Sequence, residues 1–199
     1  MASLRRRLIG VALLASAAVA FALASTVTPA FLPGSATGSG APPFVTPTPI
    51  SAFTAPALLA AGSVLLVAGV TAVAAVDLSA RLALLTPVIG ALVAIAFALG
   101  IPHDPMASLD AITESGTLAM IRSGVPAAVA AGAVAGATVA PVVRAATTED
   151  TITLLVGAVL LLVSVATASD APLSLGAGGV AGVAAVGALW AVDPATWRP

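Results

Sequence analysis

The sequence predicts an all-α integral membrane protein, a bundle of about six transmembrane helices that pack through small residues of the GxxxG type. Of 199 residues, 60% are hydrophobic and 8% are charged, whereas a soluble domain has about 25% charged residues. The mean hydropathy is +1.16. The apolar residues form long runs separated by short polar junctions, and small residues recur at every fourth position, which places them on one helix face.

Composition excludes several kinds of chemistry. Without cysteine there is no disulfide, thiolate metal site or cysteine nucleophile. A net charge of −1 gives no indication of nucleic-acid binding or of a polybasic lipid-binding patch. The chain is rich in alanine, valine and glycine and has no lysine, which indicates a GC-rich prokaryotic genome and hence the cell membrane as its location.

Residues 1–25 allow two interpretations. Three arginines precede the 18-residue apolar run Leu8–Ser25, which is close to the minimum for a spanning helix. The same pattern, followed by Ala22-Leu23-Ala24, also fits a signal peptide cleaved after Ala24. Because the run is longer than a usual signal core of about 7–15 residues, we expect a retained first helix. Cleavage would leave five spans.

Residues 26–55 are rich in proline, glycine, serine and threonine and carry no charge. Proline and glycine deny such a segment regular structure, so it builds no core and we expect an extracytoplasmic linker. The alternative is a glycosylated or partner-binding strap.

Residues 56–192 are predicted to form a domain of five transmembrane helices. The run Pro56–Val76 is expected to begin at Pro56, since a proline in the first helical turn loses no hydrogen bond. A short turn then leads into Leu82–Ile101, which makes an antiparallel hairpin. In that turn, Asp77 and Arg81 are expected to act as a helix cap and a topology anchor, with an ion pair between them as the alternative.

An extracytoplasmic loop is expected at 102–123, with a short amphipathic helix on the membrane surface. A metal site there would need His103 and Asp104 together with Asp110 or Glu114. One histidine with scattered carboxylates is a weak signal, so no metal site is predicted.

The run Gly124–Val143 carries the clearest small-residue face, and we expect this face to pack against Gly178 and Gly182 in the run Leu173–Val192. Glycine faces allow two helix axes to approach closely in a lipid environment. The predicted packing residues are Ala128, Gly132, Gly136, Ala140, Gly178 and Gly182.

Between these two runs lies Ile152–Ala168, which is rich in leucine and valine and is expected to be the lipid-facing helix. Gly157 within it is expected to face lipid. Acids and threonines just before the run are expected to cap its first turn. Residues 193–199 are expected to form a short cytoplasmic tail.

Arginine positions predict the orientation. A cytoplasmic N-terminus puts six of the seven arginines on the cytoplasmic side and leaves only Arg122 outside, in agreement with the positive-inside rule. We therefore predict that both termini are cytoplasmic. The predicted topology anchors are Arg5, Arg6, Arg7, Arg81, Arg144 and Arg198.

The apolar runs contain no ionisable residue at depth, although such residues usually mark function in membrane proteins. Their hydroxyls are expected to bond to the backbone one turn earlier; they belong to Ser63, Thr71, Thr86, Thr138 and Ser164. We therefore predict no catalytic residue and no cofactor, and expect that the chain is not an enzyme.

Three function classes remain. We expect a structural or accessory subunit, whose partners are the lipid bilayer and other membrane proteins or a second copy of itself. The first alternative is a pore or permease for a small neutral or apolar solute, with helices interrupted at Pro87, Pro126 and Pro141. An enzyme that uses the outer loop is the third.

Overall fold

In a computed structural model, residues 2–28, 48–101, 124–194 and 197 are described, and their secondary structure is helical. Predictions for the loop at 102–123, for most of the linker and for Arg198 lie outside these residues. The helices are α1 (Ala2–Val27), α2 (Pro49–Ala74), α3 (Ala80–Ala83), α4 (Leu85–Ala98), α7 (Gly124–Ala137), α8 (Val139–Thr148), α9 (Thr151–Thr167) and α10 (Pro172–Val192).

Within the described part of the chain, five stretches are long and apolar enough to cross a membrane. Two of them consist of two consecutive helices. The stretches are Leu4–Val27, Pro49–Ala74, Ala80–Ala98, Ala127–Thr148 and Pro172–Val192. With 17 residues, α9 is shorter: at 1.5 Å per residue it rises about 26 Å, against about 30 Å for a bilayer core.

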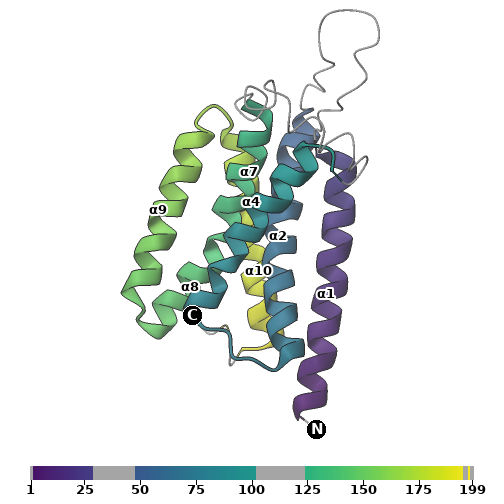
Figure 1. The fold of residues 1–199 in the computed structure, drawn as a ribbon, viewed down its shortest axis with the longest axis vertical. Helices are drawn as coiled ribbons and strands as arrows, with labels where there is room; N and C mark the ends of the chain where they lie inside the picture. Colours follow the sequence, from purple (N-terminus) through teal and green to yellow (C-terminus); the bar gives the residue numbers. More distant parts are fainter. Residues whose placement is uncertain (1, 29–47, 102–123, 195–196, 198–199) are drawn as a thin grey trace, which may run out of the picture.

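The bundle is built around α2, which packs on α1, α4, α7 and α10. Figure 1 shows α1 and α9 at opposite edges, with the other long helices between them. Helix α9 packs mainly on α7 and α8. Its large apolar side chains, such as Ile152, Leu155 and Leu162, are exposed on the outside of the bundle.

The first residue of α2 differs from the prediction. Proline was expected to start this helix at Pro56, but α2 begins at Pro49, and Pro56 lies inside it. Pro49 takes the first helical turn instead, and the Thr48 side chain caps the helix by accepting a hydrogen bond from the Ser51 amide at 3.1 Å. The end of the expected linker is therefore helical.

Two of the membrane-length stretches are interrupted close to a proline. The break between α3 and α4 falls at Leu84, just before Pro87, and the break between α7 and α8 falls at Thr138, just before Pro141. A proline inside a helix removes the amide that would bond to the carbonyl four residues earlier, and its ring crowds that carbonyl. These prolines account for the position of both breaks.

Close backbone contact joins α1 to α2. A Cβ added at Gly10 would lie 2.8 Å from the Val73 nitrogen and 2.9 Å from the Gly69 carbonyl oxygen, and one added at Gly69 would lie 2.9 Å from Leu14 Cγ. These distances are shorter than an ordinary Cβ contact, so the two glycines allow α1 to lie directly on α2.

The expectation that Gly157 faces lipid is wrong. Gly157 is buried, and a Cβ there would lie 2.8 Å from Val142 Cγ2 of α8. The turn between α8 and α9 is short, so the two helices lie side by side, and a small residue is needed where α9 crosses Val142.

Candidate functional site

The structure brings the predicted small residues of α7 and α10 together. A Cβ added at Gly178 would overlap the Gly132 carbonyl oxygen, and one added at Gly182 would overlap the Gly136 carbonyl oxygen. Conversely, a Cβ at Gly136 would overlap the Gly178 carbonyl oxygen. At these positions the two backbones leave no room for any side chain. Ala140 on α8 is fully buried, whereas Ala128 on α7 is only half-buried.

The opposite side of α10 is open. A Cβ added at Gly176, Gly179 or Gly187 would meet nothing within 4 Å. Beside two of these glycines runs an apolar groove of about 510 Å³ between α9 and α10. Its lining consists of Ala135 of α7, Val139 of α8, Leu161 and Val165 of α9, and Leu175, Gly176, Gly179, Val180 and Val183 of α10.

Thr86 joins the two interrupted stretches. Its hydroxyl lies 2.8 Å from the Ala83 carbonyl oxygen and 2.6 Å from the Ala137 carbonyl oxygen. These are the two carbonyls that Pro87 and Pro141 leave without an amide donor four residues on. The one proton of this buried hydroxyl is therefore shared between two acceptors, one on each stretch.

Ser174 has the same role for α2. The Ser174 hydroxyl of α10 donates to the Ala52 carbonyl oxygen at 2.9 Å, the acceptor that Pro56 leaves without an amide. In hydrocarbon such a carbonyl has no water to replace the lost bond. A hydroxyl of a neighbouring helix thus bonds to the carbonyl that Pro56 leaves open, and another to the carbonyl that Pro141 leaves open.

The remaining hydroxyls follow the expectation from sequence. Ser63 donates to the Leu59 carbonyl at 2.6 Å and Thr138 to the Val134 carbonyl at 2.6 Å. Thr71 and Ser164 also bond to backbone carbonyls one turn earlier. The bonds from Thr86 and Ser174 to other helices could not be predicted from the sequence, because they depend on which helices are neighbours.

Arginines gather at one end of the bundle. Arg6 of α1 donates to the Val76 carbonyl oxygen at 2.7 Å and lies 3.3 Å from the fully exposed Asp77 carboxylate. Arg144 of α8 donates to the Leu78 carbonyl oxygen at 2.7 Å. The start of α1, the α2–α3 turn and the end of α8 thus meet at this end.

The alternative ion pair between Asp77 and Arg81 does not form. Arg81 instead lies 3.8 Å from the Asp150 carboxylate. Asp150 caps α9 and accepts hydrogen bonds from the Thr153 amide at 3.2 Å and the Thr153 hydroxyl at 2.9 Å. These bonds, with a smaller contribution from Arg81, lower the pKa of Asp150. The expectation that acids and threonines cap this helix is confirmed for Asp150.

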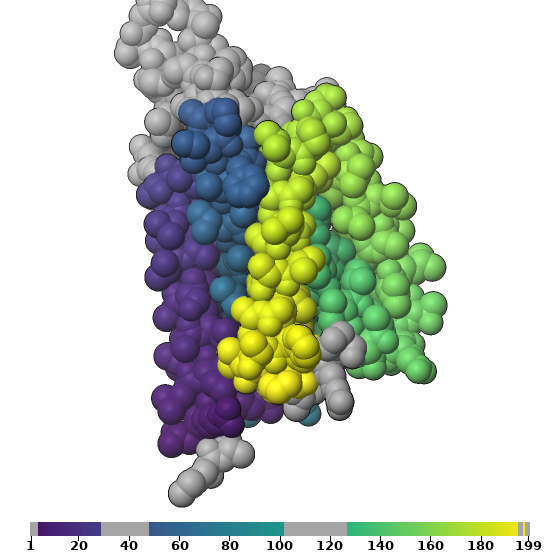
Figure 2. Space-filling model, turned by 180° about the vertical axis from the view of Figure 1, so that it is seen from behind, coloured from purple at the N-terminus to yellow at the C-terminus, as the bar shows by residue number. Residues whose placement is uncertain are grey.

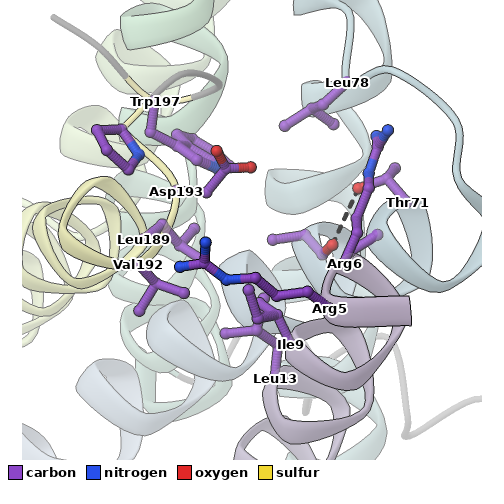
Figure 3. A pocket seen from close by; sticks show the side chains of 13 residues that line it. Arg5, Arg6, Ile9, Leu13, Thr71, Leu78, Leu189, Val192, Asp193 and Trp197 are labelled. Carbon is purple, nitrogen blue, oxygen red and sulfur yellow. Dashed lines mark hydrogen bonds between the residues drawn. The ribbon is translucent and has the colours of Figure 1, made fainter. Parts of the chain in front are cut away.

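A cavity of about 530 Å³ lies at the arginine end, between α1, α2 and α10. Figure 3 shows charged and apolar side chains from these helices gathered around it. The charged lining residues are Arg5, Arg6 and Asp193, and the apolar ones include Ile9, Leu13, Leu189, Val192 and Trp197.

Comparison with known proteins finds no family model, no curated protein and no solved structure that matches this chain. The class of protein therefore follows from the fold alone. It is an all-helical protein whose apolar helices indicate a membrane-spanning protein, with five described stretches of sufficient length. In the part of the chain that the structure describes, no group of three metal-ligating side chains comes together.

Proposed function

We propose that this chain is a structural or accessory membrane subunit without enzymatic activity, and that it packs on another membrane protein through the outer face of α10. The observation that supports this proposal most directly is the position of Gly176 and Gly179 beside the groove between α9 and α10. A glycine gives lipid chains almost no surface to pack against, whereas it allows the backbone of another helix to approach.

The two sides of α10 have different roles in this proposal. On the inner side, Gly178 and Gly182 support GxxxG-type packing within the bundle, because their Cα atoms lie against α7 backbone. On the outer side, a Cβ added at Gly176 or Gly179 would meet nothing within 4 Å. The occupant that we propose for the groove is a transmembrane helix of another membrane protein.

We also propose six spans, with α9 as the sixth. Its first turn lies at the arginine end, where Asp150 is near Arg81. The helix that follows it, α10, starts at the opposite end of the bundle, where Ser174 bonds to Ala52 near the start of α2. A 17-residue helix that connects the two ends fits a span in a locally thinned bilayer.

The proposed location is the cell membrane, with both termini in the cytoplasm. The arginines described at one end of the bundle support this orientation, because positive charge accumulates on the cytoplasmic side.

A pore or permease for a neutral or apolar solute is the second candidate. The interrupted stretches support it, since broken helices often line transport sites. In this bundle, however, the breaks are bridged by the Thr86 hydroxyl, which lies within bonding distance of Ala83 and Ala137.

The partner surface is tested by substituting Gly179 with leucine in the native host. Photo-crosslinking in the membrane through incorporated photo-leucine, which needs neither lysine nor cysteine, is compared between wild type, Gly179→Leu and Ala15→Leu, which places the same leucine side chain at an exposed site on α1. We expect a crosslinked species that disappears in Gly179→Leu and persists in Ala15→Leu. A pattern of crosslinks that is unchanged in Gly179→Leu contradicts the proposal. Fluorescence energy transfer between two labelled copies shows whether the partner is a second copy.

A further inference from the structure

A crevice separates α1 from α10 at the arginine end of the bundle. Both helices pack on α2, and Figure 2 shows α2 in blue between the purple α1 and the yellow α10. The cavity of about 530 Å³ lies in this crevice. Apolar side chains of all three helices line it, Ile9 and Leu13 of α1, Ala68 and Ala72 of α2, and Leu189 and Val192 of α10. Thr71 of α2 lines it as well, and its hydroxyl already donates to the carbonyl oxygens of Val67 and Ala68.

The mouth of the crevice carries a cation that is available to a ligand. Arg6 is already bound to the Val76 carbonyl oxygen. Arg5 is exposed, and among the described residues its guanidinium makes no hydrogen bond or ion pair. Figure 3 shows the Arg5 side chain extending from α1 toward Leu189 and Val192 of α10. Its planar group of N–H donors matches the oxygens of a phosphate.

We propose that this crevice binds one glycerophospholipid, with its phosphodiester at Arg5 and an acyl chain along Ile9, Leu13 and Leu189. Two features of the cavity select this ligand. The apolar walls leave a free phosphate ion with no favourable contact below the mouth, whereas an acyl chain fills them. Of the two arginines that line the cavity, Arg6 is already bound to the Val76 carbonyl oxygen and paired with Asp77, so Arg5 alone faces the headgroup and balances the single negative charge of a phosphodiester.

This site differs from a polybasic lipid-binding patch, which the sequence lacks. It is a single pocket between helices, in which one arginine recognises the headgroup and the walls recognise the chain. It lies on the α1 side of α10, away from the groove toward α9, and it does not depend on the proposed partner surface.

Trp197 provides a direct probe, because it lines the cavity and its side chain is buried. The only other tryptophan, Trp190, is exposed on α10 and is removed by Trp190→Phe. The full-length variant is delipidated in a maltoside detergent, which contains no phosphate. It is then titrated with phosphatidylglycerol brominated near the glycerol end of its chains, and fluorescence quenching of Trp197 is recorded.

We expect saturable quenching by brominated phosphatidylglycerol. Diacylglycerol with the same brominated chains, which lacks the phosphate, is expected to quench only weakly and without saturation. Adding inorganic phosphate is expected to leave the quenching by phosphatidylglycerol unchanged. Displacement by inorganic phosphate indicates a simple anion site and overturns the proposal, as does equal quenching by the two lipids.

Arg5→Gln and Arg7→Gln form a matched pair, because each removes one arginine from the same turn of α1 and, of these two, Arg5 lines the cavity and Arg7 does not. We expect Arg5→Gln to raise the half-quenching lipid concentration by about tenfold, as for loss of one charge-assisted hydrogen bond, and Arg7→Gln to leave it near the wild-type value. Equal shifts in both variants indicate nonspecific charge attraction and overturn the proposal. Native mass spectrometry provides a second measurement, in which one retained phosphatidylglycerol is expected in wild type and Arg7→Gln but not in Arg5→Gln.

Discussion

The Thr86 hydroxyl of α4 lies 2.6 Å from the Ala137 carbonyl oxygen of α7, the acceptor that Pro141 deprives of its amide donor. The same hydroxyl lies 2.8 Å from the Ala83 carbonyl oxygen, which Pro87 deprives in the same way. Two interrupted stretches are therefore linked at their breaks by one side chain. Replacing Thr86 removes the bond between α4 and α7 and leaves the carbonyl oxygens of Ala83 and Ala137 without this donor.

Thr86→Val is expected to lower the free energy of unfolding in detergent by about 1–2 kcal/mol, because a valine of similar shape cannot donate to either carbonyl. Thr138→Val is the matched control. Thr138 is equally buried, and the Val134 carbonyl to which it donates also accepts the Thr138 amide at 2.9 Å. Unfolding by SDS titration measures both variants, and a loss in Thr138→Val as large as in Thr86→Val contradicts this role of Thr86.

Ser174 and Pro56 are expected to be energetically coupled. Ser174→Ala removes the donor to the Ala52 carbonyl, whereas Pro56→Ala restores an amide four residues after Ala52. The cost of Ser174→Ala is therefore expected to be smaller in the Pro56→Ala background, with a coupling energy of about 0.5–1.5 kcal/mol. A double-mutant cycle of unfolding free energies measures it, and additive effects would show that Ser174 does not compensate Pro56.

Helix α9 is expected to cross the membrane despite its 17 residues. Because the chain contains no cysteine, single cysteines can be placed at the exposed residues Ala146 and Ser169, one on each side of α9. A membrane-impermeant maleimide applied to intact cells is expected to label Ser169→Cys and to leave Ala146→Cys unlabelled until the membrane is permeabilised. Equal labelling of the two positions in intact cells contradicts six spans.

The first helix is expected to remain attached in the mature protein. Helix α1 lies directly on α2 through Gly10 and Gly69, and Arg6 donates to the Val76 carbonyl. Cleavage after Ala24 removes these contacts. The intact mass of protein purified from its native host measures this, and a mature chain that begins at Ser25 shows that the signal-peptide interpretation is correct.

The fold class could be predicted because helices that cross a bilayer need long apolar runs with few charges, and both features are visible in the sequence. Helix starts and side-chain surroundings that depend on neighbouring helices could not be predicted. Pro56 fits a helix start by local rules, but it is internal because Ser174 of another helix supplies a donor to Ala52. The leucine-rich run predicts that Gly157 faces lipid, but Val142 of α8 lies against it. For the same reason, the cavity at Arg5 and Trp197 becomes visible only when α1, α2 and α10 are placed together.

Gly178 and Gly179 test the packing of α7 on α10 most directly, since they are adjacent on one helix and differ in what surrounds them. A Cβ at Gly178 would overlap the Gly132 carbonyl oxygen, whereas a Cβ at Gly179 would meet nothing within 4 Å. Both alanine variants gain the same helix propensity. In thermal melts of the purified protein in one detergent, we predict that Gly178→Ala loses about 1–3 kcal/mol of stability while Gly179→Ala matches or exceeds the wild type. Equal stability of the two variants would contradict the close contact between α7 and α10.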